Sequence, residues 1–168
     1  MRILTPTLCL TIAVLLFITT GRECDDLQKR MDAAKKEEGA ISLYGPAQRR
    51  WKSLAENGDA FAQYNLGNMY RVGHGLWEND KTAVKWYTLA AEQGHTSAQY
   101  FLGWMYADGE GVILDNVRAH MWLNIAASSE NKDATHNRDF VARRMTPADI
   151  SAAQKLAREC VRKKYKGC

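Results

Sequence analysis

The sequence contains little proline and no long hydrophobic run. Three prolines among 168 residues leave most of the chain free of helix breakers. The longest apolar stretch, residues 8–18, is 11 residues long, whereas a membrane-spanning helix needs about 20. Hydrophobic residues make up 46% and charged residues 25%, which is typical of globular proteins and argues against a disordered chain. These proportions favour a helical, globular protein.

The motifs of common catalytic and metal sites are also missing. The chain has no HExxH, CxxC, GxSxG or phosphate-binding loop motif. Its four histidines are His74, His95, His120 and His136. None of them lies four residues from another, as paired zinc ligands on a helix would. Asp108, Glu110 and Asp115 surround a turn, where acidic residues mostly cap helices. We expect no catalytic residue, no metal site and no cofactor.

Residues 1–21 have the three parts of a secretory signal peptide, namely a positive charge at Arg2, the apolar stretch and small residues at its end. We therefore expect an exported protein, periplasmic or secreted after cleavage. The alternative is an inner-membrane anchor formed by the same residues 1–21. A lipid anchor at Cys24 is disfavoured because Arg22 and Glu23 precede it. Residues 22–45 are expected to form a polar helix, over 24–37, and a linker.

Cleavage of the signal would remove Cys9 and leave Cys24, Cys160 and Cys168. Export permits disulfides, and an odd number of cysteines leaves one thiol unpaired. The closeness of Cys160 and Cys168 in the sequence favours that pair. A bond between Cys24 and Cys168, joining the two ends of the chain, is the alternative.

The strongest signal is an internal duplication with a period of 36 residues. Residues 58–91 align with 94–127, and 14 of the 34 positions are identical. Average residue frequencies would give about two by chance. A half-repeat precedes residue 58, and the pattern weakens beyond residue 129. Such duplication is the signature of a repeat architecture in which stacked units share a core.

Each unit contains two amphipathic patterns separated by glycines. Apolar residues recur at helical spacing, and Gly73 and Gly109 mark the ends of the first helices. We expect helices over 46–57, 59–72, 80–93, 96–108, 116–129, 133–145 and 147–164. Gly67 and Gly103 lie within helices, which predicts close approach by a neighbouring helix. The fold is expected to be an all-α, right-handed solenoid of two full units with flanking half-repeats and a C-terminal capping helix.

The strings AQYNLGNMYRVGHG and AQYFLGWMYADGEGV resemble the Sel1-like repeat, a relative of the tetratricopeptide repeat. The resemblance covers about residues 50–135 of the repeat region at 46–135, which has full units at about 58–93 and 94–129. Residues 138–159, within the C-terminal capping helices and basic tail at 136–168, are similar to the capping segment of small exported bacterial members. The resemblance implies an adaptor or scaffold that holds partner proteins without catalysis. A cysteine-rich branch links cysteines eight positions apart within its repeats; here only Cys160 and Cys168 have that spacing, outside both units.

Positions that differ between the two units are the candidate binding residues. Asn65, Asn68 and Arg71 become Phe101, Trp104 and Ala107 in the second unit. They lie on the first helix of each pair, which lines the concave side of such solenoids. Aromatic side chains are favoured at protein interfaces. We expect Asn65, Asn68, Arg71, Phe101 and Trp104 to contact a protein or peptide, the alternative being that the two aromatics pack against the next helix.

The last 31 residues are basic, with nine Lys or Arg against three Asp or Glu. The candidate basic patch comprises Arg158, Arg162, Lys163, Lys164 and Lys166. It suits peripheral contact with an anionic membrane surface or an acidic partner, although a basic helix end is commonly just solvated. Nucleic acid is not an expected partner of an exported chain.

The leading hypothesis is therefore an exported protein-binding module that recognises a protein or peptide in the concave groove of its solenoid. The first alternative is a small hydrolase of cell-wall or β-lactam substrates, which the cysteine-rich relatives suggest. The second is a membrane-tethered assembly factor, which would retain residues 1–21.

Overall fold

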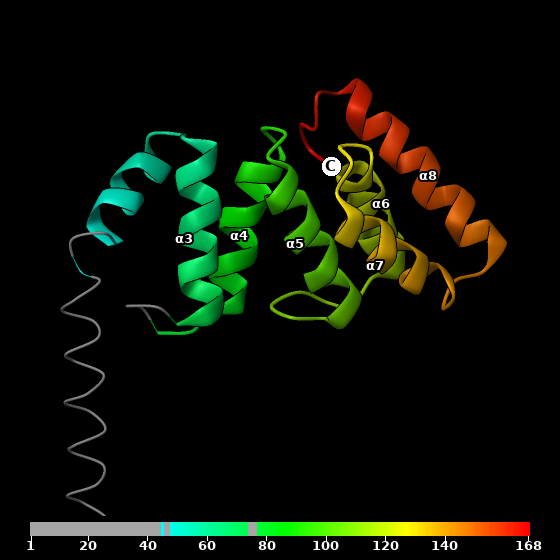
Figure 1. Cartoon of the computed structure of the whole chain (residues 1–168), viewed down its shortest axis with the longest axis horizontal. Helices are drawn as coiled ribbons and strands as arrows, with labels where there is room; N and C mark the ends of the chain where they lie inside the picture. Colours follow the sequence, from blue (N-terminus) through cyan, green and yellow to red (C-terminus); the bar gives the residue numbers. More distant parts are fainter. Residues whose placement is uncertain (1–44, 46–47, 74–76) are drawn as a thin grey trace, which may run out of the picture. The chain divides into compact units, whose positions relative to one another are not determined.

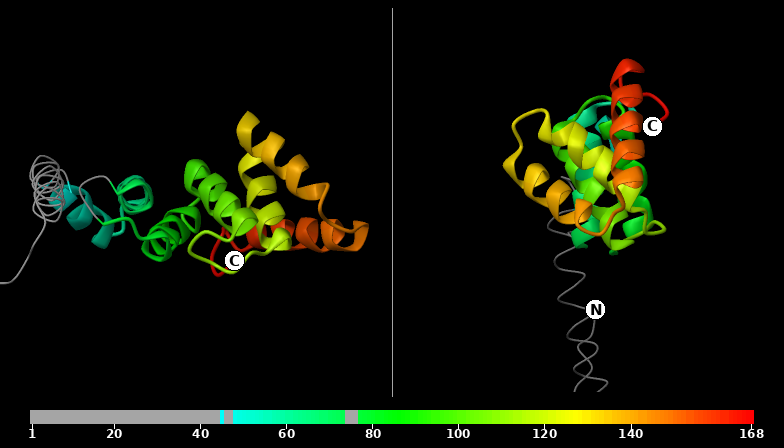
Figure 2. Two further views of the ribbon diagram at one scale, coloured as in Figure 1. Left: turned by 90° about the horizontal axis from the view of Figure 1, so that it is seen from below. Right: turned by 90° about the vertical axis from the view of Figure 1, so that its right-hand side faces the viewer.

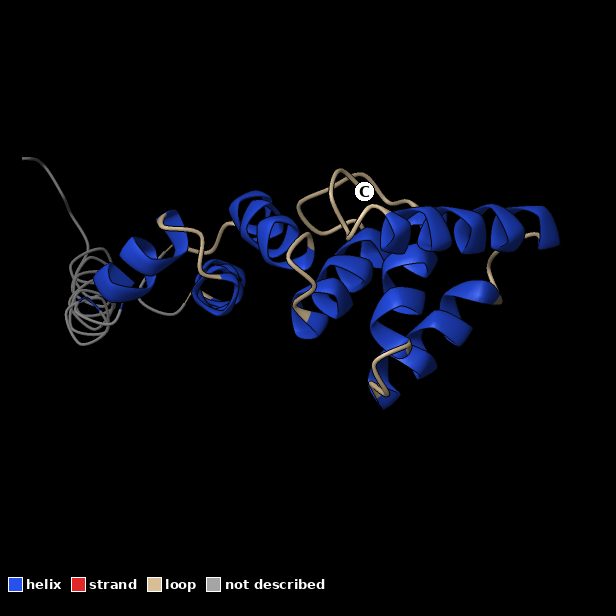
Figure 3. Ribbon diagram, turned by 90° about the horizontal axis from the view of Figure 1, so that it is seen from above, coloured by secondary structure: helices blue, strands red, loops and turns tan. Residues whose placement is uncertain are grey.

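The computed structural model describes residues 45, 48–73 and 77–168, which belong to a compact unit spanning residues 44–168. The expected signal peptide or anchor at 1–21, the polar helix at 24–37, Cys24 and His74 lie outside the described residues. Over the described ranges the chain forms helices and loops and no strand (Figure 3). None of the described helices is long and apolar enough to cross a membrane.

Six helices are assigned along this unit (Figure 1). They are α3 (Ala60–Val72), α4 (Asp80–Ala91), α5 (Thr96–Asp108), α6 (Asn116–Ala127), α7 (Lys132–Ala142) and α8 (Pro147–Arg162). Residues 48–56 are helical as well. The all-α repeat solenoid expected from the duplication is confirmed.

Several helices end earlier than the sequence predicted, and the backbone explains why. Helices α4 and α6 stop two residues before the expected ends at 93 and 129. The turns that follow them carry Gly94 and Glu130 at positive φ, 86° and 62°. Helix α7 ends at Ala142 rather than 145, and α8 at Arg162 rather than 164. Residue Lys164 has a φ of 52°, which a right-handed helix cannot contain.

The two units repeat the same helix ends. Gly73 and Gly109 close α3 and α5 in the left-handed conformation, with φ of 71° and 75°, as the sequence predicted. At the equivalent N-caps the residues differ: Asp59 caps α3, and His95 caps α5. The His95 Nδ1 accepts a hydrogen bond from the Ala98 N–H at 3.3 Å. A histidine can accept at Nδ1 only when it is neutral, so this cap depends on pH.

Neighbouring helices pack in chain order, α3 on α4, α4 on α5 and α5 on α6. Helix α7 then packs on α6, and α8 returns to pack on α6 as well. Helices α6, α7 and α8 gather at the end of this unit away from α3 (Figure 2). The main core lies between α4, α5 and α6 and includes Trp122 from the second unit and Ala157 and Cys160 from α8. The capping helix therefore shares the core of the repeats.

Neighbouring helices approach closely at Gly67 and Gly103, which confirms the prediction. A Cβ atom on Gly103 would lie 2.8 Å from the Leu123 Cγ, 3.1 Å from the Leu123 nitrogen and 3.2 Å from the Ala119 oxygen. A Cβ atom on Gly67 would lie 2.8 Å from two ring carbons of Tyr87. The second helix of each unit thus occupies the space that a side chain at the glycine would need.

A buried glutamine links each unit to the helix before it. The Nε2 of Gln63 donates to the Ala55 carbonyl oxygen at 3.1 Å, and the Nε2 of Gln99 donates to the Ala91 carbonyl oxygen at 3.2 Å. Both glutamines are almost fully buried. Their amides satisfy carbonyl groups at the end of the preceding helix, which would otherwise be costly to bury. In both units the two bonded residues are eight positions apart in the sequence. The repeated hydrogen bond therefore fixes how each helix stacks on the one before it.

The C-terminal tail folds back on the repeats and is closed by a disulfide. Cys160 and Cys168 are bonded, with a Cα–Cα distance of 5.5 Å. Within the closed loop, Tyr165 packs beside Gly94, and the Gly167 N–H donates to Glu92 Oε1 at 3.1 Å. The tail therefore joins the end of α8 to the junction between α4 and α5.

Two histidines are held neutral by their surroundings. Burial lowers the pKa of His95, the N-cap of α5. Burial also lowers the pKa of His120 on α6, and the nearby Arg138 lowers it further against a smaller opposing effect of Asp139. The His120 side chain is 3% exposed, and its Nδ1 has no hydrogen-bond partner among the described residues. Protonating His120 would charge a ring that the fold keeps away from water, and protonating the half-buried His95 would charge a ring that is partly withdrawn from it.

Substitution of Gly103 tests the close approach of α5 and α6. Alanine is the better helix former by about 1 kcal/mol, but a Cβ here meets backbone atoms that cannot move cheaply. We expect Gly103→Ala to lower the free energy of unfolding by about 1–2 kcal/mol, measured by urea denaturation. Ser151→Ala, on the exposed face of α8, is the control and should leave stability unchanged or slightly higher. A Gly103→Ala chain as stable as the wild type would contradict the packing argument.

Acid should destabilise the fold through the half-buried His95 and the buried His120. In the folded chain the pKa of each histidine lies below the ordinary 6.5 of the unfolded chain. Between its folded and its unfolded pKa, each histidine therefore binds a proton more readily in the unfolded chain. Stability is therefore complete above pH 6.5 and falls as pH drops toward the lowered pKa values. His95→Asn keeps an N-cap that does not titrate, and should reduce the loss of Tm between pH 8 and pH 5. His136→Asn, at an exposed position, should show the full loss; equal losses in both variants would be contrary evidence.

Candidate functional site

The five candidate binding residues occupy α3 and α5, the first helices of the two units. Asn65, Asn68 and Arg71 lie on α3, and Phe101 and Trp104 lie on α5. The structure brings four of them together around Tyr87 of α4. Asn65 does not join them through any hydrogen bond, because its Nδ2 donates to the Phe61 carbonyl oxygen of its own helix at 2.8 Å.

Arg71 is the centre of this group. Its Nε donates to the Tyr87 hydroxyl at 3.3 Å, and its guanidinium carbon lies 5.0 Å from the Phe101 ring centroid and 5.8 Å from that of Trp104. These distances place the cation over both rings, within reach of a cation–π interaction. One arginine of the first unit thus holds two aromatic residues of the second.

The Tyr87 hydroxyl completes the polar part of the site. It donates to the Asn68 Oδ1 at 2.7 Å while accepting from Arg71. Burial raises the pKa of Tyr87 to about 12, and the neighbouring Arg71 only partly offsets this. The phenol therefore stays protonated at neutral pH and keeps its donor role. The Tyr87 side chain is 0% exposed, so this network orders Arg71 and Asn68 from beneath.

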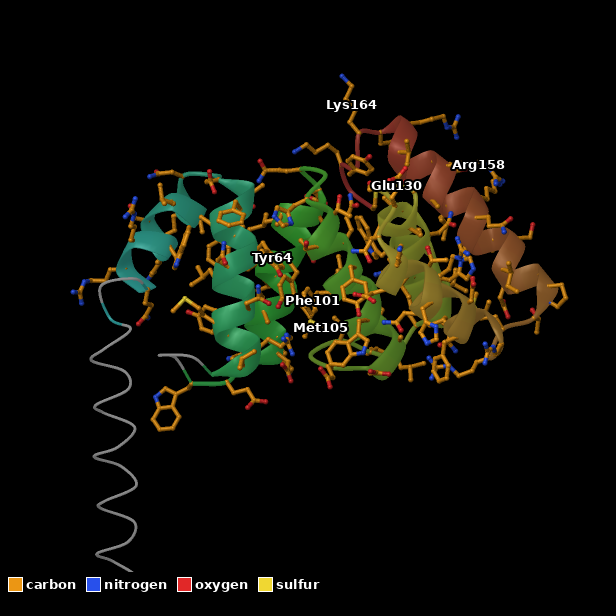
Figure 4. The ribbon with its side chains drawn as sticks, viewed as in Figure 1. Tyr64, Phe101, Met105, Glu130, Arg158 and Lys164 are labelled. Carbon is orange, nitrogen blue, oxygen red and sulfur yellow. A yellow bond between two sulfur atoms is a disulfide. The ribbon has the colours of Figure 1, made fainter. Side chains whose placement is uncertain are left out.

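Aromatic rings extend from this centre toward the start of α3. Tyr64 stacks on His95 with centroids 4.6 Å apart and lies 6.0 Å from Phe101, while Phe61 lies 6.1 Å from His95. Figure 4 shows Tyr64 on α3 and Phe101 on α5, with Met105 one turn beyond Phe101. We call this set the aromatic face; its members are Trp51, Phe61, Tyr64, Arg71, His95, Phe101 and Trp104.

The aromatic face is only partly covered. Phe61 is 56% exposed, and Tyr64, Phe101 and Trp104 are half-buried against the main core. Phe101 stacks on the buried Tyr87 with centroids 5.6 Å apart, so one side of its ring is used for packing. Phe101 and Trp104 therefore pack against neighbouring helices with part of their surface and expose the rest to solvent.

Sequence comparison of the units missed Tyr64, Tyr87 and His95. Tyr64 is identical to Tyr100, so a search for variable positions passes over it. Tyr87 and His95 do vary, since Leu123 and Asp59 occupy the equivalent positions. Applying the same criterion to the second helix and to the N-cap would have found both.

The candidate basic patch divides into two parts. Arg158 and Arg162 lie on α8, where Figure 4 labels Arg158. Lys163, Lys164 and Lys166 lie in the tail around the disulfide-closed loop and are exposed. Arg158 and Arg162, together with Lys155, line a groove of about 550 Å³ between α6 and α8. The remaining lining residues are Asn124, Ile125, Ser128, Ala157, Glu159 and Val161.

The carboxylates of the turn between α5 and α6, Asp108, Glu110 and Asp115, interact with nearby residues. Asp115 caps α6 by accepting from the Arg118 N–H at 2.9 Å. Burial raises the pKa of Glu110, and the carboxylates of Asp80 and Asp108 raise it further. Among the described residues, no group of three or more His, Cys, Asp or Glu side chains is arranged to hold a metal ion.

Comparison with known proteins identifies the repeats. The family model of the Sel1 repeat matches residues 60–95 and 96–131. No curated protein matches the chain. Among solved structures, the chain is similar to a protective antigen present in uropathogenic Escherichia coli strains that displays an SLR fold. The two are 29% identical with a TM-score of 0.69, and the match covers 79% of this chain and 30% of that one.

A Sel1 repeat protein from Oxalobacter formigenes is also similar, at 38% identity and a TM-score of 0.51 over 51% of this chain and 25% of that one. The chain thus spans less than a third of the length of either relative. Sel1 repeats are generally protein–protein interaction modules, and the family is typically non-enzymatic. Residues 60–131 of the chain therefore consist of two Sel1 repeats, and the fold resembles that of SLR proteins.

Proposed function

We propose that this protein is an exported adaptor that binds a protein or peptide segment on its aromatic face. The observation that carries the proposal is the Arg71-centred group, in which one cation contacts Phe101 and Trp104 and is held from below by Tyr87. Aromatic and arginine side chains dominate binding energy at protein interfaces.

The face is suited to binding because its side chains are already ordered. Tyr87 fixes Arg71 and Asn68 through hydrogen bonds, and stacking fixes Tyr64 on His95. A partner that binds here loses less conformational entropy in the protein than it would on a mobile surface. The exposed part of Phe61 extends the same face beyond the core. Residues from both units take part, so binding requires the stacked pair.

Export is proposed from residues 1–21, which have the pattern of a signal peptide. The bond between Cys160 and Cys168 supports the proposal, because structural disulfides persist mainly in oxidising compartments. Retention of residues 1–21 as an inner-membrane anchor would place the same adaptor at the membrane. No observation favours the hydrolytic alternative.

Substitutions that exchange the units test the face with little disturbance of the scaffold. Trp104→Asn introduces the residue found at the equivalent position 68, and Phe61→Ser introduces the residue found at 97. A displayed random-peptide library is selected on the purified wild-type chain, and the affinities of the enriched peptides are measured by fluorescence anisotropy. We expect each substitution to weaken binding about 5- to 30-fold, as removal of an aromatic anchor does.

Phe140→Ser is the matched control, since Phe140 is an exposed aromatic residue on α7 outside the aromatic face. It should change affinity less than about twofold. Circular dichroism and thermal unfolding check that all three variants fold. The proposal is wrong if no peptide is enriched, or if peptides bind the folded Trp104→Asn and Phe61→Ser chains as tightly as the wild type.

A further inference from the structure

We propose that the groove between α6 and α8 is a second binding site, which takes an acidic peptide segment bearing apolar side chains. None of its lining residues belongs to the aromatic face. Its volume of about 550 Å³ lies within the range of about 300–1,000 Å³ that ligand sites occupy. The groove is formed where the capping helix returns onto the last helix of the second unit.

The floor of the groove is apolar. Ile125 of α6 is 2% exposed and Ala157 of α8 is 3% exposed, so both belong to the packed interface between the helices. The small side chain of Ala157 leaves room above the interface that a larger residue would fill. Val161, one turn further along α8, lines the same space and is 47% exposed. Because Ile125 and Ala157 are already almost fully covered, an aliphatic or aromatic side chain of a partner would gain burial mainly against Val161.

The rim of the groove is cationic. Lys155, Arg158 and Arg162 follow one another at intervals of three and four residues, which places them along one side of α8. Glu159 is the only acidic lining residue, and its Oε1 lies 3.9 Å from an Arg162 nitrogen. Within the described part of the chain, neither Lys155 nor Arg158 forms an ion pair. The lining therefore carries a net charge of +2, three cations against one carboxylate.

This combination specifies the occupant. Two arginines and a lysine along one edge match carboxylate groups spaced along a peptide, because guanidinium groups bind carboxylates with two parallel hydrogen bonds. An apolar side chain that enters the groove is stabilised by burial against the apolar floor. A bilayer surface would meet the exposed lysines of the tail as readily as the groove, and it would have no side chain to insert. The geometry therefore favours a peptide over a membrane surface.

The probe is the labelled peptide acetyl-Asp-Leu-Glu-Glu-Leu-Asp-amide, titrated with the full chain at about 0.1 M salt, where long-range charge attraction is screened beyond about 10 Å. Its control is the same peptide with Asn and Gln in place of Asp and Glu. Arg158→Glu tests the rim. Asn124→Trp tests the space, because it fills the groove from α6 without changing the charge. Lys132→Glu, at an exposed position on α7 outside the groove, makes the same change of charge as Arg158→Glu.

We expect the acidic peptide to bind the wild-type chain and the neutral peptide to bind at least tenfold more weakly. Arg158→Glu and Asn124→Trp should each weaken binding at least tenfold, and Lys132→Glu less than threefold. Arg162→Glu is the second rim variant, used if Arg158→Glu does not fold by circular dichroism. The Trp104→Asn chain should bind this probe normally, which separates the groove from the aromatic face.

Three results would overturn the proposal. The first is no binding of the acidic peptide by the wild-type chain. The second is equal weakening by Lys132→Glu and Arg158→Glu, which would show attraction to net charge alone. The third is binding of the chain to vesicles of phosphatidylcholine with about one-third phosphatidylserine that is stronger than peptide binding and unaffected by Asn124→Trp. That outcome would identify a membrane-contacting surface instead.

Discussion

The absence of a side chain at Gly67 is the constraint on which the functional surface depends. Because residue 67 has no Cβ, the ring of Tyr87 lies where a side chain would otherwise be, 2.8 Å from that position. From there its hydroxyl reaches Asn68 and Arg71, and its ring stacks on Phe101 of the next unit. The position of Tyr87 therefore determines both the helix packing inside the first unit and the order of the surface between the units.

The second unit uses the same frame for a different purpose. Leu123 replaces Tyr87 against the equivalent glycine, so the pocket there is apolar and carries no hydroxyl. Ala107 replaces Arg71 and is buried. The duplicated scaffold thus supports a polar, aromatic site at the junction of the two units and a plain hydrophobic core beyond it. This difference explains how two units that share one backbone frame present an ordered surface at their junction.

Periodicity predicted much of this architecture, because glycines and apolar residues at a period of 36 reflect packing that every unit repeats. It predicted the helices and their approximate ranges, the glycines in the turns, and the close helix approach at Gly67 and Gly103. It could not predict features formed once: the Tyr87 network needs three helices to meet, and the groove needs α8 to return onto α6. Helix ends were also misplaced, since Glu130 and Lys164 adopt positive φ values that no residue preference indicates.

The disulfide-closed tail and the helices before it close the C-terminal end of the repeat array. Helices α7 and α8 both pack on α6, and Tyr165 rests beside Gly94 at the junction of α4 and α5. A further unit stacked after α6 would have to displace the cap and break the contacts of the tail. Growth of such a protein by duplication behind α6 would therefore require the cap to be rebuilt. A unit added ahead of the helix at residues 48–56 would instead leave the capped terminus, with its cationic groove, at the same distance from the aromatic face.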